Sequence, residues 1–133
     1  MEFPFLKNDG KRIFSLMNDP VSFFQSLYGY FNAREIESVL PHLSKDVKWA
    51  NGMDGGFVYG RDEVKAYWTR QFKEVNSRVY PIDIKPQDTK IVIRVHQVVQ
   101  DLEGKLLSDQ MVDHVFELDG DKIVSFKIGF AEA

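Results

Sequence analysis

The period at which apolar residues recur changes once along this chain, near Val79, and this change constrains the fold more than any other feature. Before it, apolar residues recur every three or four positions, which is typical of amphipathic helices; after it, they alternate with polar residues, which is typical of strands. Helices followed by strands predict an α+β domain with the helices on one face of an antiparallel sheet. The 133 residues suffice for one domain and are too few for two. We therefore expect one domain over residues 19–133 and an arm over residues 1–18 that packs on it.

Two helices are predicted before the first strand. Asp19 and Pro20 are typical of a helix start, an N-cap followed by proline at the first helical position, and this helix should run to about Asn32. A second, shorter helix is predicted over residues 36–43. Pro41 should kink it or limit it to its first turns, because proline lacks a backbone N–H.

A glycine-rich segment, Trp49 to Gly60, links a short predicted strand to a third helix. The strand is predicted over Val47 to Trp49 from its alternation, and the helix over Arg61 to Val75 from its apolar stripe. The segment has neither the Gly-Lys-Ser/Thr of a phosphate loop nor the spacing of a dinucleotide fingerprint. We predict that it forms the mouth of a pocket for a small ligand.

Four strands are predicted after the change of period, over roughly 79–86, 90–102, 105–118 and 122–131. Glu103-Gly104 is typical of a two-residue hairpin turn, and Asp119 to Asp121 of a longer one. The first turn would place Leu102 opposite Lys105, and this pairing fixes the register of the central hairpin. The resulting cross-strand pairs are Arg94 with Asp113, His96 with Met111, Ile93 with His114 and Gln97 with Gln110.

This register divides the hairpin into an apolar face, which carries His114, and a more polar face. The apolar face should cover the helices, and Arg94 and Asp113 should form an ion pair on the outer face. In the last strand, the alternation predicts a single face for Val124, Phe126, Ile128 and Phe130.

His114, with Gln97 beside it, is the candidate centre of a site in an apolar cavity. The residues expected to close this cavity are Trp49, Tyr67, Trp68 and Phe130. An imidazole in such a place can act as an acid or a base near neutral pH. The other interpretation, a core histidine whose nitrogens find ordinary partners, is equally compatible with the sequence.

Composition argues against several classes of function. The formal net charge is −3 with no block of basic residues, which does not favour a nucleic-acid partner. There is no cysteine and no His-x-His or His-Glu-x-x-His, so we expect neither a metal site nor a cofactor. The sequence shows no secretory signal pattern and no segment of membrane-spanning length, so we expect no membrane contact and a cytoplasmic location.

The order of the elements and four sequence blocks resemble the nuclear transport factor 2-like superfamily, in its SnoaL-like, ketosteroid isomerase-like branch. The blocks are Phe31-Asn32-Ala33-Arg34-Glu35-Ile36, Trp49-Ala50-Asn51-Gly52-Met53-Asp54-Gly55-Gly56, Gly60-Arg61-Asp62-Glu63-Val64 and Val95-His96-Gln97-Val98-Val99. The resemblance covers Pro20 to Phe130 and implies a cone-shaped, cystatin-like α+β fold, with three N-terminal helices packed on a curved antiparallel sheet.

Set against the ketosteroid isomerases, the resemblance implies that Asp113 takes the place of the protonated oxyanion-hole aspartate. The general-base aspartate of that family falls on Asn51, and the oxyanion tyrosine falls on Leu27, with Tyr28 one position away. Without the base, steroid isomerisation is not expected. Strand alternation turns His114 inward and Asp113 outward, whereas the alignment places Asp113 inward, and one β-bulge would reconcile the two. Both residues are therefore candidate catalytic residues.

The sequence predicts a small-molecule-binding protein with an apolar pocket for an apolar or ring-containing metabolite. If it is an enzyme, we expect a cofactor-free isomerase, cyclase or dehydratase with His114 as the acid or base. The candidate ligand-binding residues are Trp49, Asn51, Tyr59, Tyr67, Trp68, Gln97 and Phe130. The alternative is a non-catalytic homodimeric domain with a vestigial pocket, whose partner surface would be the outer sheet face with Val92, Val98, Met111 and Val115.

Overall fold

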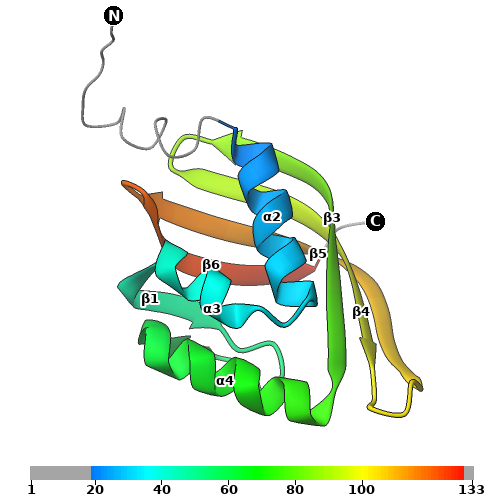
Figure 1. The fold of residues 1–133 in the computed structure, drawn as a ribbon. Helices are drawn as coiled ribbons and strands as arrows, with labels where there is room; N and C mark the ends of the chain where they lie inside the picture. The colour runs from blue at the N-terminus through cyan, green and yellow to red at the C-terminus, as the bar shows by residue number, and fades with distance from the viewer. Residues whose placement is uncertain (1–18, 131–133) are drawn as a thin grey trace, which may run out of the picture.

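A computed structural model describes residues 19–130 of the chain, so the predicted arm over residues 1–18 lies outside the described residues. The elements in chain order are α2 (Pro20–Asn32), α3 (Ile36–Val39), a 3₁₀ turn η1 (Leu40–His42), β1 (Leu43–Ala50), β2 (Phe57–Tyr59), α4 (Gly60–Glu74), β3 (Asn76–Gln87), β4 (Lys90–Gln100), β5 (Leu106–Asp119) and β6 (Lys122–Phe130). The strands form one six-stranded sheet in the order β2-β1-β6-β5-β4-β3 (Figure 1).

The predicted α+β class is confirmed: three helices pack on a curved sheet (Figure 1). The long strands β3, β4 and β5 bend along their length, so that the sheet curves around the helices. All neighbouring strands are antiparallel except β1 and β6, which run parallel. The core lies between helices and sheet, and its fully buried side chains include Phe24, Leu43, Val47, Val64, Ile93, Val95, Val112 and Ile123.

Helix α2 begins as its sequence predicts. The Asp19 carboxylate accepts a hydrogen bond from the backbone N–H of Ser22 at 3.1 Å, and Pro20 occupies the first turn. The helix ends at Asn32, and its buried face carries Phe24, Leu27 and Tyr28.

The second predicted helix is shorter than its apolar pattern. It ends at Val39, and Pro41 lies in the 3₁₀ turn that follows. The proline limits the helix as expected, because its ring is not compatible with a helix interior. The prediction that Leu43 belongs to this helix is wrong. Leu43 begins β1, where its side chain is fully buried.

The glycine-rich segment contains a strand that sequence reasoning missed. Residues Phe57–Tyr59 form β2, which pairs antiparallel with Lys48, Trp49 and Ala50 of β1. The chain reverses between the two strands over residues 51–56, which we call the glycine loop, and Gly55 and Gly56 both have positive φ there. A strand of three residues is too short to show an alternation of apolar and polar side chains in the sequence.

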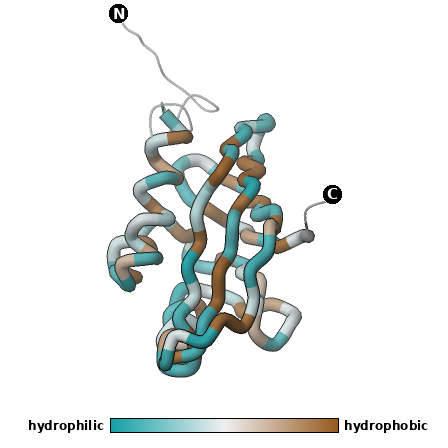
Figure 2. The backbone as a smooth tube through the Cα atoms, turned by 90° about the vertical axis from the view of Figure 1, so that its right-hand side faces the viewer, coloured by the Kyte–Doolittle hydropathy of each residue, from teal (hydrophilic) through white to brown (hydrophobic). Residues whose placement is uncertain are grey.

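The predicted pairs of the central hairpin are confirmed, although the predicted turn is wrong. Asp101, not Leu102, closes the turn, because its N–H donates to the carbonyl of Lys105 at 2.8 Å. The register then shifts between Val99 and Gln100, where Leu107 is the extra residue on β5. This bulge offsets the longer turn, so Arg94 still pairs with Asp113 and the apolar face is the predicted one (Figure 2 shows the alternation of hydropathy along the strands).

The face predicted for β6 is right for Phe126 and Ile128 and wrong for Val124. The register between β5 and β6 shifts at this point, so that Leu118 pairs with Ile123 and Glu117 with Ser125. The shift buries Ile123 in place of Val124. The turn before β6 is shorter than predicted, since Asp119 pairs directly with Lys122.

Candidate functional site

A cavity of about 360 Å³ lies between the helices and the sheet. Trp49, Tyr67, Trp68, Gln97 and His114 all line it, so five of the residues that the sequence singles out belong to one cavity. Gln97 does not lie beside His114 as expected, because it pairs with Gln110, four residues along β5 from His114. Further aromatic side chains in its wall are Tyr28, Phe31, Phe116 and Phe126. The helical spacing of α4 and the alternation of β4 and β5 aim these side chains at one space.

No Asp, Glu, Lys or Arg of the described chain lines the cavity. Its polar side chains are all neutral types apart from His114: Tyr28, Tyr67, Gln71, Ser77, Gln97, Ser108 and Gln110. An apolar wall with a few polar groups is the usual composition of a small-molecule site. Sequence reasoning missed Tyr28, Gln71, Ser77 and Ser108 as parts of the site.

His114 forms a buried pair with Tyr28. The Tyr28 Oη lies 2.6 Å from His114 Nδ1, and the side chains are about 5% exposed. Burial lowers the pKa of His114 to about 3, against the opposing effect of the Asp113 carboxylate, and burial raises the pKa of Tyr28 well above its usual value. Both groups are therefore neutral at pH 7. This corrects the expectation that the His114 imidazole titrates near neutral pH in the empty site.

The pair leaves one imidazole nitrogen for a ligand. When the Tyr28 hydroxyl donates to Nδ1, the imidazole proton lies on Nε2. No residue of the described chain forms a hydrogen bond with that Nε2. A neutral imidazole with a free N–H can polarise a carbonyl group, so the pair can act as a hydrogen-bond donor to a ligand without carrying charge.

Asp113 lies outside the cavity, which corrects its expected place at the site. Its carboxylate accepts a hydrogen bond from Arg94 Nε at 2.9 Å on the other face of the sheet. The register of β4 and β5 is regular from Lys90 to Val99, so no bulge turns Asp113 inward. The alternation, rather than the alignment, gives the right orientation, and the predicted Arg94–Asp113 pair is confirmed.

Asn51, Tyr59 and Phe130 were also expected at the ligand. Asn51 does not line the cavity, because its Oδ1 accepts the backbone N–H groups of Met53 at 3.0 Å and Asp54 at 2.9 Å. Tyr59 is 56% exposed at the start of α4 and does not line the cavity either. Strand β6 ends at Phe130, whose side chain lies outside the described part of the chain.

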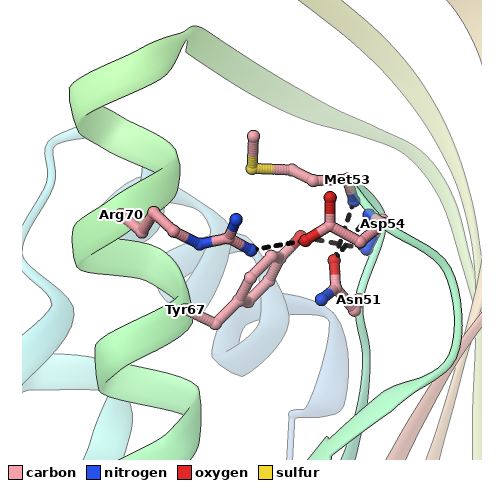
Figure 3. Close-up of polar contacts among 6 residues, drawn as sticks. Asn51, Met53, Asp54, Tyr67 and Arg70 are labelled. Atoms are coloured by element: carbon pink, nitrogen blue, oxygen red, sulfur yellow. Dashed lines mark hydrogen bonds and ion pairs between the residues drawn. The ribbon is translucent and has the colours of Figure 1, made fainter.

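The glycine loop forms part of the cavity wall through Gly52 and Met53. Two contacts hold it to α4 (Figure 3). The Gly52 N–H donates to Tyr67 Oη at 3.0 Å, and Arg70 pairs with the Asp54 carboxylate at 2.6 Å. The hydroxyl of Tyr67 thus holds the loop while its ring lines the cavity.

Comparison with known proteins identifies the fold of this chain through solved structures. Neither a protein-family model nor a curated protein matches the sequence. Several solved structures do match. An NTF2-like protein of unknown function from Burkholderia pseudomallei is 24% identical with a TM-score of 0.73, over 84% of this chain and 89% of its own. The protein TerC, co-crystallised with polyporic acid, is 21% identical with a TM-score of 0.72, over 84% and 90%.

The chain has the NTF2-like fold. The predicted resemblance to the nuclear transport factor 2-like superfamily is thereby confirmed at the level of fold. A third structural neighbour, a candidate polyketide cyclase from Sinorhizobium meliloti, is 12% identical with a TM-score of 0.66, over 76% of this chain and 87% of its own. A shared fold does not imply a shared function, so the function of this chain depends on the side chains of its own cavity. Within residues 19–130, none of the helices combines the length and apolar character that crossing a membrane requires.

Proposed function

We propose that this NTF2-like chain binds a neutral, ring-containing and largely apolar small molecule in its cavity. The observation that carries the proposal is the aromatic-lined space of about 360 Å³, large enough for such a ligand. The neighbours support the ring-containing class of ligand, because one was crystallised with polyporic acid and another is a candidate polyketide cyclase. The alternative of a vestigial pocket requires that the cavity binds nothing.

The ligand should be neutral because the described cavity wall offers it no charged partner. Moving an unpaired charge into an apolar space costs several kcal/mol, far more than the apolar contacts of one ring return. His114 does not supply a positive charge at pH 7, since burial lowers its pKa to about 3.

The two tryptophans of the chain both line the cavity and report its occupancy. We expect 2-acetylnaphthalene, a neutral probe, to change their fluorescence saturably. The carboxylate 2-naphthoate has a similar size and should bind at least about tenfold more weakly. Equal affinity for the two probes would contradict the neutral class, and no binding of either would contradict the proposal.

A matched pair of variants checks that the probe enters this cavity. Val99 lines the cavity and Val98 lies on the opposite face of β4. Val99→Phe should fill the space and abolish the fluorescence change, whereas Val98→Phe should leave it intact. A probe that binds both variants equally well would lie elsewhere on the molecule.

Cofactor-free proton transfer is the second candidate function, and the Tyr28–His114 pair favours it. A ketone oxygen next to His114 Nε2–H would gain a hydrogen bond as negative charge develops on it, which promotes loss of a proton from the neighbouring carbon to solvent. Nuclear magnetic resonance in D₂O should then show faster deuterium exchange at the acetyl methyl of bound 2-acetylnaphthalene. If His114→Gln still binds the probe but no longer accelerates deuterium exchange, catalysis by His114 is supported. If the wild-type protein does not accelerate the exchange, catalysis is contradicted and only the binding function stands.

A further inference from the structure

Gln71 is the polar residue that α4 presents to the cavity from its last two turns. It follows Tyr67 by four residues and Trp68 by three, so all three lie on one helix face. Its side chain is 9% exposed and lines the cavity, which is unusual for a long amide side chain.

The side-chain amide of Gln71 has no hydrogen-bond partner among residues 19–130. Its Oε1 is buried without a hydrogen bond, and no other described residue bonds to its side chain. The other such buried side-chain atom in residues 19–130, Ser125 Oγ, belongs to a residue that does not line the cavity. Buried carbonyl groups are nearly always paired, because leaving one unpaired destabilises the fold. Gln71 lines the cavity, so rotation of its terminal amide turns this unpaired acceptor towards a donor on a ligand.

Further neutral polar groups gather at the same end of the cavity. The C-terminal turn of α4 leads directly into β3, and the start of β3 pairs with the end of β4 (Figure 1). Gln97 of β4 in turn pairs with Gln110 of β5. The polar side chains that this arrangement adds to the wall are Ser77, Gln97, Ser108 and Gln110.

The polar end lies away from the Tyr28–His114 pair. Gln110 and His114 point to the same face of β5 and are four residues apart, which corresponds to about 13 Å along a strand. A ligand that reaches both His114 and the polar end of the cavity is therefore elongated. It carries one polar group at each end of an apolar body.

We propose that Gln71 orients the ligand by accepting a hydrogen bond from a hydroxyl group on it. This inference rests on the proposed function and adds the chemical class: an elongated, ring-containing compound with a carbonyl group next to His114 and a hydroxyl group next to Gln71. An ammonium group is excluded as the donor, since the described wall holds no carboxylate to pair with it.

Two probes that differ in one hydrogen-bond donor test the inference. 6-Acetyl-2-naphthol carries a carbonyl and a hydroxyl at opposite ends of a flat body, and 2-acetyl-6-methoxynaphthalene replaces the hydroxyl by a methyl ether. We expect the naphthol to bind the wild-type protein roughly three- to tenfold more tightly, the range of one net hydrogen bond. Isothermal titration calorimetry measures both affinities.

The variant Gln71→Met keeps the length of the side chain and removes the acceptor, and Gln25→Met is its control at an exposed position of α2. The ratio of the two affinities, naphthol over methyl ether, should fall to about one in Gln71→Met and should keep its wild-type value in Gln25→Met. The thermal midpoint of ligand-free Gln71→Met should not fall, because the variant removes an unpaired group.

The outcomes separate the two proposals. If the wild type binds both probes equally, or if Gln71→Met keeps the preference, the role of Gln71 is overturned while the cavity remains a binding site. If the wild type binds neither probe and also fails to bind 2-acetylnaphthalene, the proposed function itself fails.

Discussion

His114 should make this chain sensitive to acid. The pKa of His114 is about 3 in the folded chain and 6.5 in the unfolded chain. Between these two pH values, His114 is protonated in the unfolded chain and neutral in the folded chain. The contribution of His114 to the free energy of unfolding is therefore fully present well above pH 6.5 and is lost as the pH falls through 6.5 towards 3. Between pH 7 and pH 5 the loss should be about 2 kcal/mol.

Urea denaturation at pH 7 and pH 5 measures this loss. In His114→Gln, which retains a polar partner for Tyr28, the difference between the two pH values should become smaller by about 2 kcal/mol. An unchanged difference would mean that other groups cause the acid sensitivity, of which His42 is one, because burial also lowers its pKa.

At the scale of single residues, the sequence predicts orientation well and hydrogen-bond partners poorly. Alternation placed His114 and Gln97 in the cavity and Asp113 outside it, because side-chain direction in a strand depends on register alone. The partnership of His114 with Tyr28 joins residues 86 positions apart, so no local pattern reveals it. Asn51 was misassigned for a similar reason: its amide serves its own loop, which an alignment with an aspartate does not show.

At the scale of elements, the attachment of the glycine loop to α4 should depend more on Tyr67 than on the ion pair. Tyr67→Phe removes the acceptor of the part-buried Gly52 N–H and should lower the free energy of unfolding by about 1 kcal/mol. Asp54→Asn removes the exposed pair with Arg70 and should cost less than about 0.5 kcal/mol. Chemical denaturation of the two variants gives both values, and the reverse ranking would contradict the assignment.

The elements themselves follow from sequence wherever a long pattern exists. Helices α2 and α4 and strands β3 to β6 extend over nine residues or more and were predicted to within a few residues. Strand β2 has three residues and was missed. The predicted length of the turn before β5 was also wrong. Two-residue and three-residue turns differ in backbone geometry, which the pair Glu103-Gly104 alone does not determine.

At the scale of the whole molecule, we predict a homodimer through the outer sheet face. This face carries apolar side chains between its ion pairs, among them Met111, which is 38% exposed, and Val92, Val98 and Val115. Analytical ultracentrifugation should give twice the chain mass. Met111→Asp should shift the equilibrium towards monomer, whereas Leu102→Asp, at the exposed tip of the β4–β5 hairpin, should not. A wild-type monomer at high concentration would contradict the prediction.

The parallel pairing of β1 with β6 has a consequence for how the molecule folds. Strand β6 lies between β1 and β5, so it alone joins the first half of the sheet to the second. Until the ribosome has released β6, both halves keep an open edge, and the cavity lacks the wall that Phe126 and Ile128 provide. Contacts this distant in sequence form slowly. A ligand of the cavity can therefore be recognised only after β6 has paired with both β1 and β5, and it cannot assist any folding step that precedes this pairing.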